Sequence, residues 1–275
     1  MCPLGWHEGL IFKLKQNGIS GNLLNLFQNY LKNRKQRVVL NGYSSEYSLV
    51  ESGVPQGSVL APLLFLIYIN DLETKIRSNI IFFADDTMLF SIVKKPEMTA
   101  SDLNQDLEEI SSWAFQWKLQ FNPDVNKQAT EMLFTSKNKG PPHPNLFFNG
   151  NLVTKSFEQK HLGLILEPGL SFQKHILEKI KKAKKYLVII KRLSNFFPVK
   201  TLCQMYKTLV RSHLDYCDII YHISSIHSQT GIILPGLMEQ LENLQYQTAM
   251  CITGTWKGTN RSKSYGELGW ESPSE

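Results

Sequence analysis

The sequence predicts an α+β fold in which helices and antiparallel hairpins come first and an all-helical part follows. Apolar residues recur at helical spacing near the N-terminus, and short alternating runs flank Asn-Gly turns at 41–42 and 149–150. From residue 171 onward strand patterns stop and only helical patterns continue. We therefore expect three regions, over residues 1–170, 171–253 and 254–275, the last of them polar and loose.

The N-terminal elements are two short helices and a hairpin. Helical patterns over residues 8–32 break at Asn17-Gly18, and Ser20 stands where the second helix needs an N-cap. Alternating residues over 37–50 then surround Asn41-Gly42, a dipeptide suited to the type I′ turn of a hairpin.

The middle of the chain is expected to form a buried helix, a hairpin, an amphipathic helix and two further strand segments, over residues 59–75, 80–93, 101–119, 129–135 and 161–166. The apolar run that opens the first helix ends at Ile69, so it has the length of a core helix. Trp113 and Trp117 lie on the apolar face of the amphipathic helix, and we expect them in the core rather than in a stacking platform.

Helical patterns near residues 171–195, 198–221 and 236–252 make up the C-terminal part. The first of these helices concentrates basic side chains, which are Lys174, Lys179, Lys181, Lys182, Lys184, Lys185, Lys191 and Arg192. A lysine run commonly forms only a solvated helix face. The alternative is a surface that contacts phosphates.

Composition is that of an ordinary globular protein, with 42% hydrophobic and 20% charged residues among 275. The net charge of +6 weakly favours a polyanionic partner. The four cysteines show neither a C-x-x-C pair nor zinc-site spacing, which indicates reduced thiols. Neither a signal peptide nor an apolar stretch of membrane-spanning length is present, so we expect an intracellular protein, cytoplasmic or nuclear, without a membrane partner.

Two neighbouring aspartates, Asp85 and Asp86, interrupt apolar runs in the hairpin expected over 80–93. A carboxylate pair at the tip of a hairpin suits Mg²⁺, which takes one or two carboxylates and leaves its other positions to water and phosphate oxygens. An ordinary Asp-Asp turn is the alternative from these residues alone.

A loop before the apolar helix adds a second signal. Gly53-Val54-Pro55-Gln56-Gly57-Ser58 contains two glycines, which allow a backbone to approach a ligand closely, and it leads directly into a helix start. Four segments of the chain carry a resemblance to a known family, which are GVPQGSVLAPLLFLIYINDL, FFADDT, WAFQWKLQFN and HLGLILEPGLSFQKH. In these segments and in their order, the chain resembles the reverse transcriptases of LINE-type (non-LTR) retrotransposons, jockey-like elements among them. The resemblance covers roughly residues 6 to 260.

The resemblance implies a partial polymerase palm, an antiparallel sheet with helices, over 1–170 and a helical thumb over 171–253. It implies RNA-templated DNA synthesis with deoxynucleoside triphosphates, a DNA primer on an RNA template, and Mg²⁺ or Mn²⁺ on Asp85 and, secondarily, Asp86. It further implies contacts to substrate or nucleic acid by Pro55, Gln56, Gly57, Ala84, Gly163, Lys181, Lys182, Lys184 and Lys185. From the residues alone, Gly163 fits equally well a bend in a core strand.

One family feature is absent from this sequence. The family's first palm motif places an aspartate three residues before a Trp-His pair, and here that position before Trp6-His7 is Pro3. We therefore expect a truncated, inactive copy whose metal site is incomplete. Three other acidic residues could replace the missing aspartate as a metal ligand, but their context is more typical of solvated helix residues. They are Glu8, Asp71 and Glu73. A non-catalytic nucleic-acid-binding remnant and a decayed open reading frame both remain open.

Overall fold

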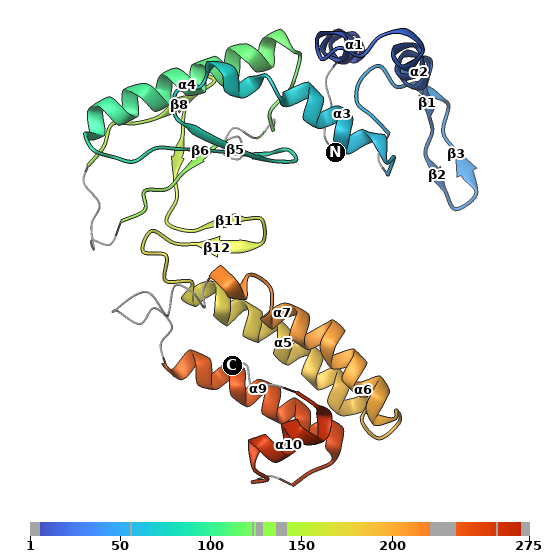
Figure 1. Ribbon diagram of the computed structural model, residues 1–275, viewed down its shortest axis with the longest axis vertical. Helices are drawn as coiled ribbons and strands as arrows, with labels where there is room; N and C mark the ends of the chain where they lie inside the picture. The colour runs from blue at the N-terminus through green and yellow to red at the C-terminus, as the bar shows by residue number, and fades with distance from the viewer. Residues whose placement is uncertain are drawn as a thin grey trace. The chain divides into compact units, whose positions relative to one another are not determined.

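The structure is a computed structural model that describes residues 6–55, 57–122, 124, 129–135, 142–220, 235–256 and 258–270. The chain divides into two compact units, Met1–Glu131 with Pro141–Lys155 and Met132–Gly140 with Ser156–Glu275. Both units combine helices with small two-stranded sheets, as the α+β prediction requires (Figure 1).

The helices of the first unit are α1 (His7–Gln16), α2 (Gly21–Leu31), α3 (Leu60–Ile69), the short 3₁₀ helix η1 (Leu72–Lys75) and α4 (Pro96–Gln116). They share one hydrophobic core. Trp113 and Trp117 are 6% and 9% exposed, which confirms that these tryptophans belong to the core.

The sheets of the first unit each contain two strands in the described residues: β1 (Lys35–Gln36) with β4 (Ser48–Leu49), β2 (Val39–Leu40) with β3 (Tyr43–Ser44), β5 (Asn79–Phe83) with β6 (Asp86–Phe90), β7 (Thr130–Glu131) with β10 (Thr154–Lys155), and β8 (Phe147–Phe148) with β9 (Asn151–Leu152). The β7–β10 pair is parallel and the others are antiparallel. Asn41-Gly42 and Asn149-Gly150 both have positive φ at each residue, so they form the predicted type I′ turns.

The described residues of the second unit form the hairpin β11 (Gln159–His161) with β12 (Leu164–Leu166). They also form the helices α5 (Gln173–Leu193), α6 (Val199–Tyr206), the π-helical turn η3 (Lys207–Arg211), α7 (Ser212–Leu214), α9 (Pro235–Thr253) and α10 (Arg261–Leu268). Helix α5 buries Ile176, Ile180, Ala183, Leu187 and Ile190 at spacings of three and four, which places one apolar stripe against the core.

The hairpin β11–β12 joins the helical unit, although the sequence divides the chain at residue 170. Two contacts account for this. The His175 imidazole Nδ1 accepts the N–H of Ile165 at 3.2 Å, and the Tyr216 hydroxyl donates to the carbonyl of Leu162. The division of the molecule into palm and thumb at residue 170 stays a prediction.

The C-terminal segment differs from the expected loose tail. Helix α10 lies within 254–275, and Asn260 caps it by accepting the N–H of Ser262 at 2.9 Å. Tyr265 and Trp270 are 5% and 8% exposed, and Trp270 stacks on Tyr206 with ring centroids 4.1 Å apart. These two buried aromatic side chains hold the segment against the rest of the unit. The prediction of a loose tail is based on the average polarity of the segment, which does not reveal two individual aromatic residues.

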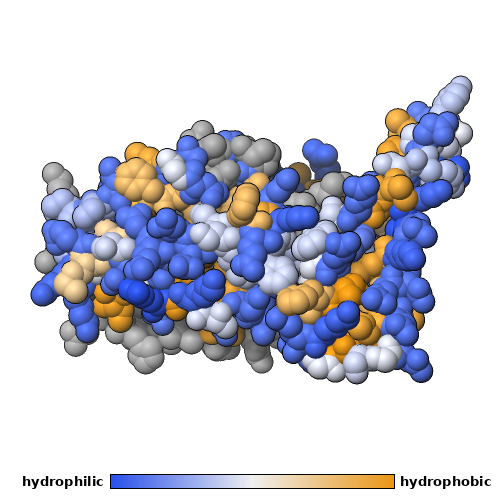
Figure 2. All heavy atoms as spheres, turned by 90° about the horizontal axis from the view of Figure 1, so that it is seen from above, coloured by the Kyte–Doolittle hydropathy of each residue, from blue (hydrophilic) through white to orange (hydrophobic). Residues whose placement is uncertain are grey.

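The helix expected to be buried over 59–75 is only partly so. It ends at Ile69, with η1 following, and Val59, Leu63 and Leu66 are 94%, 52% and 52% exposed. Figure 2 shows orange hydrophobic patches among the mainly hydrophilic residues of one face. Among the described residues, none of the helices has the length and apolar character to cross a membrane.

Candidate active site and nucleic-acid interface

The hairpin β5–β6 presents the two aspartates. Phe83 pairs with Asp86 across the ladder, so Ala84 and Asp85 form the turn and Asp86 opens β6. This confirms the predicted placement at a hairpin turn. Both carboxylates are exposed, Asp85 in the turn and Asp86 at the start of the strand. Ala84 has φ +51°, a left-handed conformation that L-residues rarely adopt.

A buried carboxylate from α4 holds the start of this hairpin in place. Asp106 is 1% exposed, and its two oxygens accept the backbone N–H groups of Arg77 and Ser78, each at 2.9 Å. Because Ser78 directly precedes β5, this contact fixes the strand that leads to Asp85. The sequence offered only one weak sign of it, an acidic residue on the apolar side of an amphipathic helix.

Two side-chain contacts position the loop that leads into α3. The His7 imidazole Nε2 lies 2.7 Å from the carbonyl oxygen of Gly53, and the Tyr30 hydroxyl donates to the Ser58 hydroxyl at 2.6 Å. Ser58 also accepts the N–H of Leu60 at 3.2 Å, which caps the helix start. Sequence reasoning did not identify these supporting residues.

The predicted substrate-contacting residues of this loop are Pro55, Gln56 and Gly57. Pro55 is half-buried and Gly57 is exposed with φ +82°, whereas Gln56 lies outside the described residues. That the loop faces Asp85 and Asp86 stays a prediction. Pro3 lies outside the described residues as well.

Asp71 has a structural partner rather than the solvated role expected of it. The Lys13 ammonium, whose residue is 1% exposed, donates to Asp71 Oδ1 and to the carbonyl of Tyr68, each at 2.5 Å. The Trp113 indole donates to the same Asp71 oxygen at 3.1 Å. The ammonium also lies 3.8 Å from the Trp117 ring centroid. Burial lowers the pKa of Lys13, and Asp71 opposes that shift.

Two carboxylates at the β5–β6 hairpin are candidate oxygen ligands for a hard cation. Asp85 and Asp86 have the donor chemistry that Mg²⁺ or Mn²⁺ requires. In the described part of the chain, however, side chains do not assemble into a group of three or more that could hold a metal ion. Asp71 is engaged by Lys13, so it does not complete the set.

The predicted phosphate-contacting lysines lie on the outer side of α5. Lys181, Lys184 and Lys185 are exposed, and Lys182 is half-buried. The Lys182 ammonium pairs with Glu178 one turn earlier at 2.5 Å, which lowers the pKa of that carboxyl. Three of the four predicted lysines are thus exposed to solvent outside the apolar stripe.

Gly163 has a structural reason to be glycine. Leu162 and Gly163 form the β11–β12 turn with φ +46° and +81°. A Cβ atom at Gly163 would lie 2.8 Å from the Tyr216 hydroxyl oxygen and 3.2 Å from its ring. Packing against Tyr216 therefore requires glycine even without a ligand. Contact with a primer stays a prediction.

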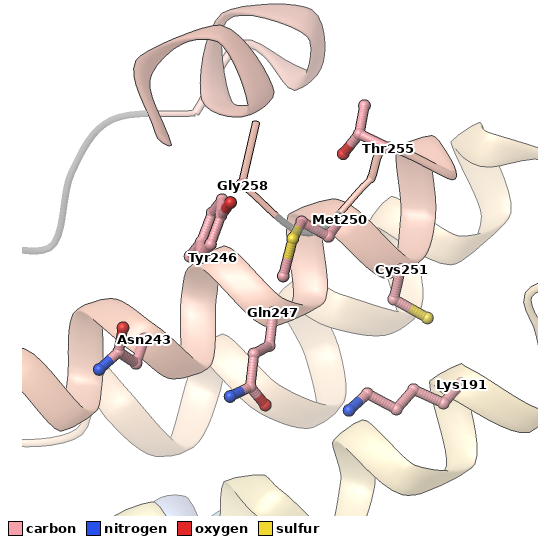
Figure 3. A pocket seen from close by; sticks show the side chains of 8 residues that line it. All are labelled: Lys191, Asn243, Tyr246, Gln247, Met250, Cys251, Thr255 and Gly258. Carbon is pink, nitrogen blue, oxygen red and sulfur yellow. The ribbon is translucent and has the colours of Figure 1, made fainter. Parts of the chain in front are cut away.

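The described part of the second unit also contains a cleft of about 600 Å³ along α9. Figure 3 shows Lys191 extending from α5 toward α9, which contributes Asn243, Tyr246 and Gln247. Asn243 already accepts from Arg261 at 2.6 Å, and the Tyr246 hydroxyl donates to the carbonyl of Thr259 at 2.5 Å. These polar groups bind the start of α10 and the residues just before it, so the cleft is explained by packing within the unit.

Comparison with known proteins adds a family. The model of the family described as reverse transcriptase (RNA-dependent DNA polymerase) matches residues 6–166. The chain is 28% identical over 235 residues to an RNA-directed DNA polymerase from mobile element jockey of Drosophila funebris, covering 80% of this chain and 25% of that protein. It is 26% identical over 262 residues to the Drosophila melanogaster jockey protein, covering 90% and 27%.

A probable RNA-directed DNA polymerase from transposon X-element of Drosophila melanogaster is 28% identical over 261 residues, which cover 90% of this chain and 27% of that protein. The chain thus spans about a quarter of the length of these curated relatives. The matched family region contains the loop over 53–58 and the Asp85-Asp86 hairpin.

Proposed function

This chain belongs to the reverse transcriptase (RNA-dependent DNA polymerase) family, and from that premise we propose that it is the polymerase segment of a jockey-like non-LTR retrotransposon protein. The observation that carries the proposal is the position of Asp85 and Asp86 at a hairpin turn inside the matched region. In the ancestral reaction, a primer 3′-hydroxyl attacks the α-phosphorus of a deoxynucleoside triphosphate, and the bond to the β-phosphate breaks to release pyrophosphate. An RNA template selects the nucleotide.

The proposal assigns roles to the residues of the first unit. Asp85 is the main ligand for Mg²⁺ or Mn²⁺ and Asp86 the second. When bound, the ions neutralise charge on the phosphates and align the reacting oxygens. Pro55, Gln56 and Gly57 border the nascent base pair, and Ala84 packs near the primer end.

The second unit supplies nucleic-acid contacts in this proposal. Gly163 and its neighbours hold the primer strand, while Lys181, Lys182, Lys184 and Lys185 meet phosphates of the RNA–DNA duplex. Contacts of this kind add affinity without sequence preference. Because three of these lysines are exposed, they need no rearrangement to reach a phosphate.

A second candidate function for this chain alone is nucleic-acid binding without catalysis. It is favoured because, among the described residues, the hairpin contributes only two carboxylates and these do not belong to a group of three or more that could hold a metal ion. Asp71 does not add a third, since it is paired with Lys13. Metal assistance contributes several kcal/mol, so an incomplete site reduces the rate by roughly a thousandfold or more at about 1.36 kcal/mol per tenfold.

Primer extension on an RNA template separates the two candidates. With Mg²⁺ or Mn²⁺, we expect the chain alone to bind the primer–template but to extend the primer no faster than a background reaction. Extension that disappears in Asp85→Ala would show that another carboxylate completes the site. Extension that persists in Asp85→Ala would contradict the assignment of the active hairpin.

A further inference from the structure

One basic and aromatic surface of the first unit has no role in the assignments above. It is the arm, defined as residues 32–50, which contains β1 to β4 and follows α2. Figure 1 shows it as a pair of antiparallel ribbons that extends away from α1 and α2. Every residue from 35 to 49 is exposed, whereas Leu31 just before the arm is 2% exposed.

The arm is held in one shape despite this exposure. Lys35 pairs with Leu49 and Val39 with Ser44 in its two ladders. Between the ladders, the carbonyl of Val38 accepts the N–H of Ser45 at 2.9 Å, and the Val38 N–H donates to the Ser45 hydroxyl at 3.0 Å. The hydrogen bonds therefore run from the base of the arm to its Asn-Gly turn.

Cations and tyrosines meet on the arm in pairs. The Arg37 guanidinium carbon lies 4.9 Å from the Tyr47 ring centroid. At the base, the Arg34 guanidinium carbon lies 5.1 Å from the Tyr30 ring centroid, and its Nη1 donates to the Tyr30 carbonyl at 3.2 Å. A guanidinium held over a ring keeps its planar set of donors presented to solvent.

Apolar and aromatic exposure is unusually high on the same arm. Tyr43 and Tyr47 are 83% and 60% exposed, and Val38 and Leu40 are 70% and 69% exposed. Two-stranded ribbons are marginally stable alone, so a bare arm of this kind is typical of a contact surface. Its basic residues, Lys32, Arg34, Lys35 and Arg37, outnumber Glu46 as the acidic residue within it.

We propose that the arm is a contact surface for single-stranded RNA. Basic side chains attract the phosphates, and exposed tyrosine rings stack on unpaired bases, each of which offers a π-face. An acidic or purely apolar protein partner would match only one of these two features. This inference rests on the proposed function, because the template of a reverse transcriptase is a single strand before it is copied.

Photocrosslinking and binding with a fluorescent oligouridine test the proposal on the full chain. In the chain without substitutions, 4-thiouridine in the oligonucleotide should crosslink to peptides of residues 32–50. Tyr43→Leu with Tyr47→Leu keeps the apolar surface but removes the rings, and should weaken binding by about fivefold or more. Lys35→Gln with Arg37→Gln should flatten the slope of log affinity against log salt by about 1.4.

The control is Lys94→Gln with Lys155→Gln, which removes the same charge from exposed positions outside the arm. It should leave affinity within about twofold, and it should change the slope of log affinity against log salt less than the arm variant does. Crosslinks confined to peptides outside the arm, or unchanged binding by both arm variants, would overturn the arm proposal. Failure to bind oligouridine would also overturn it. None of these results tests the proposed function, which is tested separately by binding of the RNA–DNA hybrid.

Discussion

At the residue scale, the β5–β6 hairpin presents two exposed carboxylates, Asp85 and Asp86, which the proposal assigns to a metal cation. Neither Asp85 nor Asp86 is drawn into the core, and the apolar strands on either side hold them at the turn. Asp71 differs from them, because the Lys13 ammonium and the Trp113 indole both donate hydrogen bonds to its carboxylate.

Mn²⁺ binding tests this contrast between the carboxylates. Asp85→Asn with Asp86→Asn should weaken Mn²⁺ binding by about tenfold or more, because a hard cation loses both charged oxygen ligands. Electron paramagnetic resonance of free Mn²⁺ measures the effect, and Asp102→Asn, an exposed change on α4, is the control. Equal losses in the double variant and the control would remove the hairpin as the metal site.

His175 should make stability depend on pH. It is 0% exposed, and burial followed by the nearby Lys179 lowers its pKa below the usual 6.5, while a backbone group of Tyr216 and the Glu178 carboxylate oppose the shift. Lys160 adds to the lowering. Between the lowered pKa and about 6.5, the unfolded chain binds more protons than the folded chain, so the free energy of unfolding rises with pH.

Urea unfolding from pH 5 to 7.5 measures this dependence. The rise should be smaller in His175→Gln than in the unsubstituted chain, with no difference in slope above about pH 7. His213, whose pKa is also lowered by burial, contributes to both proteins and cancels in the comparison. Identical pH slopes would mean that His175 does not titrate with folding.

At the element scale, the β5–β6 hairpin carries local strain at its turn. Ala84 adopts φ +51°, which costs about 1 kcal/mol relative to a residue without a Cβ atom. Ala84→Gly should therefore stabilise the first unit by about 0.5–1 kcal/mol. Ala61→Gly, within α3, should destabilise it by a similar amount.

Urea unfolding of both variants decides the point, since the two changes are chemically identical but fall on opposite backbone conformations, left-handed at Ala84 and helical at Ala61. Destabilisation of similar size in both would show that the turn is not strained as described. A role of Ala84 in holding the primer end would appear separately, as weaker primer–template binding without a change in stability.

The Lys13–Asp71 pair joins three elements of the first unit, since Lys13 lies in α1, Asp71 just before η1 and Trp113 in α4. Asp71→Asn leaves the buried ammonium without its carboxylate and should cost about 2 kcal/mol. Glu73→Gln, exposed and two residues away, should cost less than about 0.5 kcal/mol.

Chemical denaturation with a fluorescence readout follows both changes, because Trp113 and Trp117 report on this core. If Asp71→Asn lowers the free energy of unfolding no more than Glu73→Gln does, Asp71 is a solvated residue, as its sequence context indicates, and its contact with Lys13 does not stabilise the fold.

Local signals were enough to predict most elements. The Asn-Gly turns, the break at Asn17-Gly18 and the hairpin around Asp85 depend on backbone preferences of a few neighbouring residues. The interactions that the sequence did not reveal join distant residues: Lys13 with Asp71, Asp106 with Arg77, and Tyr216 with Leu162. Such pairs have no periodicity or local spacing through which a single sequence could indicate them.

At the scale of the whole molecule, the chain combines a unit with a carboxylate hairpin and a unit with a basic helix. The two functions proposed for these units are separable. In the proposal, metal chemistry is assigned to Asp85 and Asp86 and duplex binding to α5, so loss of the first should leave the second in place.

Affinity for an RNA–DNA hybrid across a salt series tests the central claim most directly. The unsubstituted chain should bind with a steep salt dependence, and Lys181→Gln, Lys182→Gln, Lys184→Gln and Lys185→Gln together should flatten the slope of log affinity against log salt by roughly one unit for each phosphate that the variant no longer neutralises. Lys182 is paired with Glu178, so we expect the smallest share from it. An unchanged slope, or a hybrid that does not bind even at low salt, would contradict the account and leave these lysines as a solvated helix face.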